Sequence, residues 1–230
     1  MGGQACVFYG AAEFSRDCDI VMSDEESNLQ KLRSALNALD ARCIAVPPFD
    51  PVYLARGHAV HFRCHHSEAK GMRLDVMTKM RGVDEFGSLW ERRTTLQDAD
   101  SVQFELLGIH DLIKAKKTQR DKDWPMIRRL VESHYAAHRA DPNDDRIAFW
   151  LLESRTPAML IEVAAEYDSA ARSLTKKRPL LNEAFGASES ALEKELRTEQ
   201  FDAQGQDRNY WNPLKRELER LRRDADRKHG

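Results

Sequence analysis

The chain has 230 residues, of which 41% are hydrophobic and 32% are charged, and its formal net charge is −2. This apolar content suffices for a folded core. The small net charge excludes an overall positive charge that would attract nucleic acid to the whole surface. No stretch approaches the roughly 18 apolar residues of a membrane span, and no basic-then-apolar leader is seen, so we expect a cytoplasmic protein without membrane contact. The four cysteines lack paired CxxC spacing and are expected to be reduced thiols.

The first half of the chain alternates short apolar runs with turn residues, which predicts strands interspersed with a few helices. A glycine pair leads into a short helix that is expected to end at Gly10. A longer helix with a stripe of leucines is expected to begin at an N-cap formed by Ser27. The predicted strands cover residues 17–22, 43–46, 59–64, 72–77 and 102–107. Turn residues separate the third strand from the fourth, so these two are expected to form a hairpin.

The second half of the chain is helical in pattern. Helices are predicted at residues 109–119 and 124–134, and a polar linker follows at residues 140–145. Beyond the linker, apolar residues continue at helical spacing, and the last helix is expected to begin near Pro213. The apolar stripes before that last helix comprise Ile147, Trp150 and Leu151, then Leu160, Val163, Ala164, Tyr167 and Ala171.

The polar linker is the clearest boundary in the sequence. It separates a predicted core, residues 1–138, from a predicted helical extension, residues 139–230. Strands and helices are mixed in the core, which is typical of an α+β fold with a small mixed sheet and helices on its faces. The extension is then an appended helical subdomain.

Three aspartates suggest a site for a divalent metal ion. Asp17 and Asp19 lie two residues apart in a predicted strand, so their side chains point to the same face. Two carboxylates held together repel each other, and a divalent cation relieves that repulsion. Asp75 lies in another strand that is otherwise apolar, where a carboxylate is costly without a partner. A solvated turn would explain Asp17 and Asp19 if they stood alone, so the metal interpretation depends on the other motifs that accompany them.

The segments around these aspartates resemble a known superfamily. Residues 2–5 (Gly-Gly-Gln-Ala), Tyr9-Gly10 and residues 15–20 (Ser-Arg-Asp-Cys-Asp-Ile) resemble the first motif of nucleotidyltransferase-fold proteins. That motif is a glycine pair, a short helix and an acid-x-acid strand. Residues 74–77 (Leu-Asp-Val-Met) look like the later strand of the same fold, which carries the third acid. The resemblance implies a nucleotidyltransferase-like core.

A later motif narrows the resemblance to one branch. Lys116, Arg120 and Asp123 resemble the helical K-x3-R-x2-D element of AbiEii-like toxins, a branch that includes toxin–antitoxin nucleotidyltransferases. Their spacing of i, i+4 and i+7 predicts one shared helix face. The alternative is an exposed stripe of ion pairs, and Lys114 and Lys117 are rivals for the basic role. The resemblance covers residues 2–135.

The resemblance implies a metal-dependent transferase that moves a nucleoside monophosphate from a nucleoside triphosphate to a hydroxyl acceptor. The implied metal is Mg²⁺ or Mn²⁺, and the implied acceptor is RNA or protein, with an antitoxin-like protein as a further partner. The implied metal ligands are Asp17, Asp19 and Asp75. The implied catalytic residues are these three aspartates and Lys116. The implied nucleotide-binding residues are Gly2, Gly3, Arg16, Lys116, Arg120 and Asp123. Asp75 would also accept the proton of the attacking hydroxyl.

Other interpretations stay open at this point. The chain is alternatively a catalytically inactive nucleotidyltransferase-like module for binding or interaction, or an enzyme that modifies a small molecule. A zinc site among the histidines of residues 58–66 is disfavoured, because His61 and Cys64 point to opposite faces of a strand. Basic residues near Trp90 and at Arg128-Arg129 are either a groove for an RNA acceptor or a solvated face balanced by acids.

Overall fold

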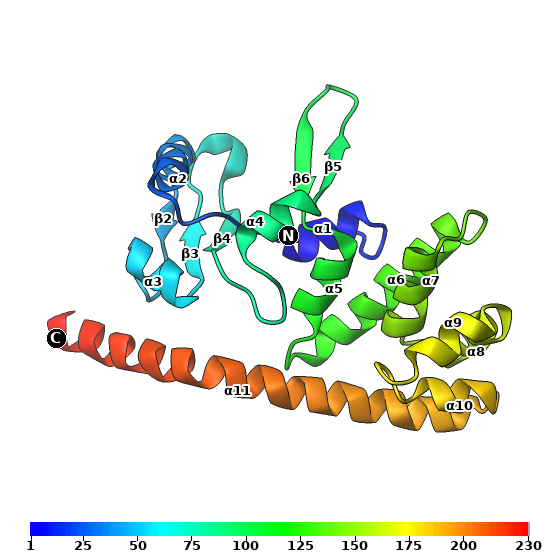
Figure 1. Ribbon diagram of the computed structural model, residues 1–230. Coiled ribbons are helices and arrows are strands. Elements are labelled where there is room, and N and C mark those ends of the chain that lie inside the picture. The colour runs from blue at the N-terminus through cyan, green and yellow to red at the C-terminus, as the bar shows by residue number, and fades with distance from the viewer. Residues whose placement is uncertain (230) are drawn as a thin grey trace. The chain divides into compact units, whose positions relative to one another are not determined.

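The structure is a computed structural model that describes residues 1–229, with side chains through Arg227. It confirms the predicted α+β class, because a small sheet is combined with many helices (Figure 1). Within residues 1–229, no helix combines the length and the apolar character that crossing a bilayer requires.

Contacts between residues divide the chain into two compact units. The first, called the sheet unit, comprises residues 1–8, 13–115 and those from 209 onward. The second, called the helical unit, comprises residues 9–12 and 116–208. The boundary predicted at residue 139 falls inside the helical unit, between α6 (Trp124–His138) and α7 (Asp144–Glu153). These two helices pack together there, with the Tyr135 ring centroid 4.9 Å from that of Trp150.

A four-stranded mixed sheet organises the sheet unit, in the order β1-β4-β3-β2. Its strands are β1 (Asp17–Val21), β2 (Arg42–Cys43), β3 (Val60–Arg63) and β4 (Arg73–Met77). β1 and β4 run parallel, whereas β3 is antiparallel to both β4 and β2. The predicted hairpin is confirmed as the β3–β4 pair, with the short 3₁₀ helix η1 (Ser67–Ala69) between the strands.

Alternation along the strands gives the sheet one apolar face and one polar face. The apolar face packs against α2 (Glu26–Ala38) and α3 (Pro51–Arg56), which lie against the sheet in Figure 1. The buried residues of this core are Met22, Leu29, Leu32, Leu36, Leu54, Val60, Phe62, Leu74 and Val76. The leucine stripe was therefore predicted correctly, although the N-cap of α2 is Glu25 and not Ser27. The opposite face of the sheet does not contact this core, and it carries the charged residues.

The sheet unit contains further helices and strands. It contains α1 (Gly2–Phe8), α4 (Phe86–Glu91), β5 (Thr94–Gln97), β6 (Gln103–Leu106) and α5 (Ile109–Lys116). β5 and β6 form an antiparallel two-stranded arm (Figure 1). The sequence predicted β6 and α5 but missed β5, which alternates half-buried and exposed residues and has little apolar signal.

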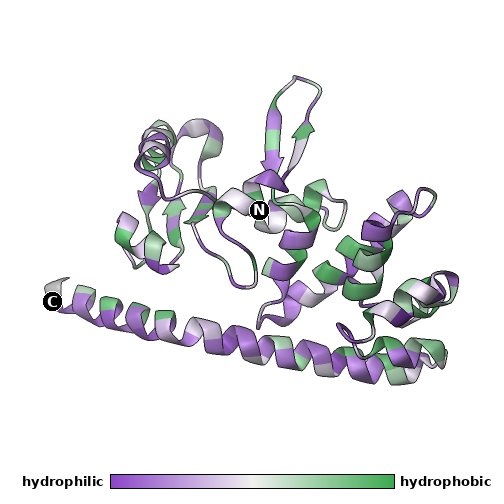
Figure 2. Ribbon diagram, viewed as in Figure 1, coloured by the Kyte–Doolittle hydropathy of each residue, from purple (hydrophilic) through white to green (hydrophobic). Residues whose placement is uncertain are grey.

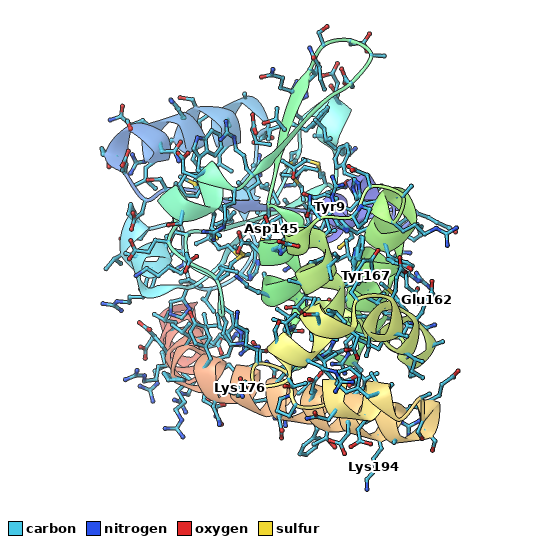
Figure 3. The ribbon with its side chains drawn as sticks, turned by 45° about the vertical axis from the view of Figure 1, so that its right-hand side comes forward. Tyr9, Asp145, Glu162, Tyr167, Lys176 and Lys194 are labelled. Carbon is cyan, nitrogen blue, oxygen red and sulfur yellow. The ribbon has the colours of Figure 1, made fainter. Side chains whose placement is uncertain are left out.

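The helical unit is built on apolar faces that the sequence predicted well. After η2 (Asp121–Asp123) and the helices α6 and α7, it continues with α8 (Pro157–Glu166), α9 (Asp168–Leu174) and α10 (Leu181–Phe185). Trp150 and Leu160 are fully buried at its centre. Polar side chains lie on the outside of this unit. Lys194, in the helix that follows α10, projects away from the other helices (Figure 3).

The last helix, α11 (Glu189–His229), is longer than predicted, because Pro213 lies inside it and not at its start. Residues 189–208 of α11 belong to the helical unit, and residues from 209 onward belong to the sheet unit. Figure 2 shows that its ribbon is hydrophilic along most of its length. The buried residues among its described side chains, Leu192, Leu196, Gln204 and Asp207, all lie in its first part, and residues 209–227 are half-buried or exposed.

An ion-pair cluster attaches the second part of α11 to α3. Glu217 accepts hydrogen bonds from Arg56 and from Nε2 of His58, the latter at 2.9 Å, and His58 is 2% exposed. The hydrogen bond from His58, with a further one from Arg56, lowers the pKa of Glu217. A carboxylate with a lowered pKa stabilises the fold above its ordinary pKa, and this contribution disappears as the pH falls through the lowered value.

We therefore expect Glu217→Gln to lower the free energy of unfolding by about 1 kcal/mol at neutral pH, since His58 and Arg56 lose a charged acceptor. The difference from the wild type should shrink as the pH falls below the ordinary range of glutamate. Thermal melting across pH measures this, with Glu219→Gln as the exposed control on the same helix. A difference that grows toward acid pH would contradict the assignment.

Candidate functional site

Two of the predicted aspartates lie side by side on the polar face of the sheet. Asp19 of β1 is the register partner of Asp75 of β4, and Asp75 is in turn the partner of His61 of β3. Neighbouring strands are about 4.8 Å apart, and paired residues share a face. Asp17 occupies the same face one step earlier, opposite Arg73. The structure therefore brings the three aspartates together on one surface.

Asp75 is the most buried of the three acids, and its side chain is 11% exposed. Its Oδ1 accepts hydrogen bonds from Nε of Arg73 and Nδ1 of His61, both at 2.8 Å. Burial alone would raise the pKa of Asp75, but the hydrogen bonds from His61 and Arg73 outweigh it and lower the pKa below the ordinary value. Asp75 is therefore an ionised carboxylate held in a fixed position.

Arg73 is a residue of this site that sequence reasoning missed. The pKa of its guanidinium is raised by the hydrogen bond to Asp75 and further by the charges of Asp75, Asp17 and Asp19. Its positive charge therefore counters the mutual repulsion of the three acids. The signal was available, because Arg73 lies two residues before Asp75 in one strand and must point to the same face.

The glycine pair of α1 lies directly against Asp19. A Cβ atom on Gly2 would be 1.8 Å from Oδ2 of Asp19, and Gly2 has a φ of +67°. The backbone N–H of Gly3 lies 3.4 Å from the same oxygen, and a Cβ on Gly3 would be 2.4 Å from Oγ of Ser15. Glycine is required here because α1 approaches β1 too closely for a side chain.

This geometry predicts different outcomes for the two glycines. Gly2→Ala should displace the Asp19 carboxylate and strain the backbone, which lowers stability by about 1–3 kcal/mol. Gly3→Ala meets a movable hydroxyl, so adding Ser15→Ala should recover part of the stability lost. Thermal melting of the single and double variants tests this, with Gly87→Ala as the control, because a Cβ at Gly87 meets nothing within 4 Å. Equal effects at all three glycines would refute the close approach.

The residues of the predicted K-x3-R-x2-D element converge on one another within the helical unit. Asp123, whose side chain is 5% exposed, accepts from Lys116 at 3.4 Å, from Nε of Arg120 at 2.8 Å and from Thr118 at 2.5 Å. The prediction of a single helix face was wrong, because α5 ends at Lys116 and a turn precedes η2. Ion pairing around a buried acid, and not helical periodicity, joins these residues.

Most of the other basic candidates are balanced by acids. Arg92 donates to Asp111, which is 1% exposed, and to Asp84. Arg93 donates to Glu105 and lies 4.1 Å above the Trp90 ring. Arg128 pairs with Glu132. Arg16, predicted to bind nucleotide, is exposed, and its guanidinium lies 6.0 Å from the Phe14 ring centroid.

The fit of a metal ion depends on the number of protein ligands required. Across the described side chains, no three His, Cys, Asp or Glu residues gather as a ready-made metal cage. Mg²⁺ needs only one or two carboxylates when phosphate oxygens and water complete its shell. Asp19 and Asp75 place carboxylates at adjacent positions, so these donors would suit a Mg²⁺ ion whose shell is otherwise filled by phosphate oxygens and water.

The candidate site is thus a carboxylate pair with a third acid beside it, an arginine among the three, and a glycine turn against one of them. No family model, curated protein or solved structure matches the chain. The case for a function therefore depends on the geometry and on the motifs of this chain itself.

Proposed function

We propose that the chain has a nucleotidyltransferase-like fold and transfers a nucleoside monophosphate from a nucleoside triphosphate to a hydroxyl acceptor. The observation that carries this proposal is the register of Asp19 with Asp75 on parallel strands, with Gly2 and Gly3 packed against Asp19. The N–H of Gly3 donates to Oδ2 of Asp19, so the glycine turn holds one carboxylate of the pair in place. That combination suits a triphosphate accompanied by a divalent cation.

Asp17 and Asp19, together with Asp75, would hold Mg²⁺ or Mn²⁺, which when bound neutralises phosphate charge and orients the phosphates. Asp75 is ionised, so its free oxygen can accept the proton of the acceptor hydroxyl. The hydroxyl oxygen then bonds to the α-phosphorus as the bond to the pyrophosphate oxygen breaks, and pyrophosphate leaves with that electron pair. Arg73 and His61 keep Asp75 in position, so positioning and electrostatics supply most of the acceleration.

One observation favours a second candidate, a nucleotidyltransferase-like module that binds without catalysis. Arg73 and His61 both bond Oδ1 of Asp75, and the Arg73 charge already compensates the acids. Such an arrangement is stable without a metal. This candidate predicts nucleotide binding, or binding of a protein partner such as an antitoxin, without release of pyrophosphate.

The deciding experiment incubates the protein with each α-labelled nucleoside triphosphate in turn, with Mg²⁺ or Mn²⁺, and with RNA or protein as acceptor. We expect label to enter a macromolecule, with one pyrophosphate released per transfer and no label transferred in EDTA. Nucleotide binding without transfer under all conditions supports the inactive module. Absence of both nucleotide binding and transfer refutes the proposal. The cytoplasmic location remains a prediction.

A further inference from the structure

A cavity of about 850 Å³ lies at the carboxyl ends of the two strands that carry the acids. Its walls are residues 22–25, which directly follow β1, residues 78–87, which directly follow β4, and Tyr210 of α11. All of these residues belong to the sheet unit. Because β1 and β4 are parallel, their carboxyl ends meet at one edge of the sheet. Ligands of sheets that contain parallel strands typically bind in the crevice outside these ends.

The cavity lies within reach of the carboxylates. Met22 comes three residues after Asp19, and Thr78 comes three residues after Asp75. A strand rises about 3.3 Å per residue, so the cavity begins about 10 Å beyond the two acids. A ligand that contacts both places must therefore be longer than a phosphate group. The cavity volume lies within the range of roughly 300–1,000 Å³ that is typical of small-molecule sites.

The walls of the cavity suit a neutral aromatic ligand better than an anion. Phe86 is half-buried and stacks on Trp90 with ring centroids 5.8 Å apart, whereas Tyr210 is 40% exposed. The charged residues of the walls are the acids Asp24, Glu25, Asp84 and Glu85 and the cations Lys79 and Arg81. Even with Arg92, which pairs with Asp84, positive charge is not in excess. The cavity therefore does not attract phosphates.

We propose that this cavity binds the nucleoside of the nucleoside triphosphate, with the base stacked on Tyr210. The inference rests on the proposed function, in which Asp19 and Asp75 hold a cation and, through it, the phosphates. From there the ribose and the base extend past the strand ends into the cavity, where Phe86 supplies apolar contact. Every base has a π face, so stacking on one ring accepts all four bases.

Gly87 offers a way to fill the cavity without disturbing the fold. It lines the cavity from α4, and a Cβ atom there would meet nothing within 4 Å. Gly87→Trp should weaken binding of ATP, GTP, CTP and UTP about tenfold or more, since stacking of the base is lost. Gly87→Ala should bind them as the wild type does. Isothermal titration calorimetry with Mg²⁺ measures the affinities. The matched control is Ser88→Trp, because Ser88 is the next residue of α4, is exposed and is not among the residues that line the cavity.

Two further measurements separate the nucleoside from the phosphates. Magnesium tripolyphosphate has no nucleoside, so Gly87→Trp should bind it as tightly as the wild type does. Tyr210→Ala should weaken binding of ATP about tenfold, and Tyr210→Phe, which retains the ring, should not. The control for loss of an exposed ring is Phe201→Ala, in the part of α11 that belongs to the helical unit. Circular dichroism establishes that each variant is folded.

Three results would overturn the inference. They are unchanged ATP affinity in Gly87→Trp, an equal loss in Ser88→Trp, and an equal loss of tripolyphosphate affinity, which would assign the cavity to the phosphates. A chain that binds nucleotides through the cavity yet transfers nothing would refute the proposed function alone. Normal transfer and nucleotide affinity with the cavity filled would refute this inference alone, and absence of nucleotide binding by the wild type would refute both.

Discussion

Asp19→Asn should abolish nucleotidyl transfer, with a loss of at least about a hundredfold, while leaving the fold intact. Removal of even an outer-shell partner of a metal ligand typically lowers activity 10–100-fold, so loss of a ligand itself should lower it at least that much. Asparagine has nearly the shape of aspartate, so the close packing of Gly2 against residue 19 is preserved. The substitution therefore changes charge and little else.

The stability of this variant is the more discriminating measurement. Asp19 adjoins Asp75 and lies near Asp17, and like charges held together destabilise the folded state. We expect the free energy of unfolding to change by less than about 1 kcal/mol or to rise, as is common when a strained active-site charge is removed. The control is Asp202→Asn, which changes an exposed acid of α11 in the helical unit. Full transfer activity in Asp19→Asn would remove Asp19 from the catalytic site.

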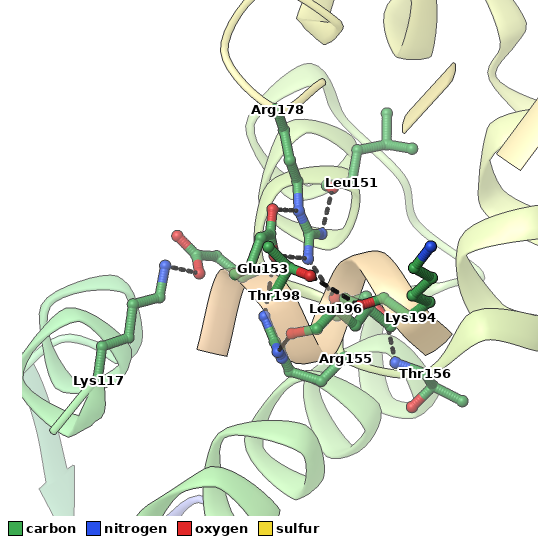
Figure 4. Close-up of polar contacts among 11 residues, drawn as sticks. Lys117, Leu151, Glu153, Arg155, Thr156, Arg178, Lys194, Leu196 and Thr198 are labelled. Atoms are coloured by element: carbon green, nitrogen blue, oxygen red, sulfur yellow. Dashed lines mark hydrogen bonds and ion pairs between the residues drawn. The ribbon is translucent and has the colours of Figure 1, made fainter. Parts of the chain in front are cut away.

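Glu199→Gln should destabilise the helical unit by about 3 kcal/mol. Glu199 accepts two hydrogen bonds from Arg178, at 3.0 and 2.9 Å, and one from Arg155 at 2.9 Å. Figure 4 labels the two arginines. Arg178 also donates to the backbone carbonyls of Leu151 and Ser154, which end α7. The side chains of Arg155 and Arg178 are only 10% and 5% exposed. Without Glu199, two buried guanidinium groups would lose their shared counter-ion.

The pKa of Arg155 shows the cost of this burial. Desolvation, opposed by the charge of Glu199 and assisted by that of Arg178, lowers the pKa of Arg155 to about 10. Urea denaturation measures the effect of Glu199→Gln, and Glu193→Gln is the matched control, because Glu193 pairs with Arg197 on the exposed surface. Equal unfolding midpoints for the two variants would show that the cluster contributes no more than a surface pair.

Local periodicity predicted the elements that lie on one side of an apolar core. The sequence predicted the β1 strand, the β3–β4 hairpin, the leucine face of α2 and the apolar faces of α7 and α8. Each of these patterns is complete within a short stretch of neighbouring residues. The break after Lys116 and the continuation of α11 through Pro213 were missed. The segment after Lys116 contacts a residue distant in the sequence, since the N–H of Gln119 donates to Asp207, and α11 beyond Pro213 is bonded through Glu217 to Arg56 and His58.

The charged surface could be predicted only in part. Spacing within β1 placed Asp17 and Asp19 on one face, but nothing in the sequence states which residue of β4 lies opposite Asp19. The register of the strands is set by packing on the apolar face of the sheet. If one strand shifted by one residue, its charged side chains would turn toward the core. The alignment of Arg42, Arg63 and Arg73 is a consequence of that register, since the three residues come from three different strands. The activity itself remains a prediction.

The parallel pairing of β1 with β4 has a consequence for synthesis of the protein. Asp19 is translated long before Asp75, and two strands, two α-helices, one 3₁₀ helix and their loops lie between β1 and β4. Parallel strands cannot pair until the whole crossover has formed. A ribosome-bound chain that has not yet exposed β4 therefore lacks Asp75 and cannot assemble the carboxylate pair of the candidate site.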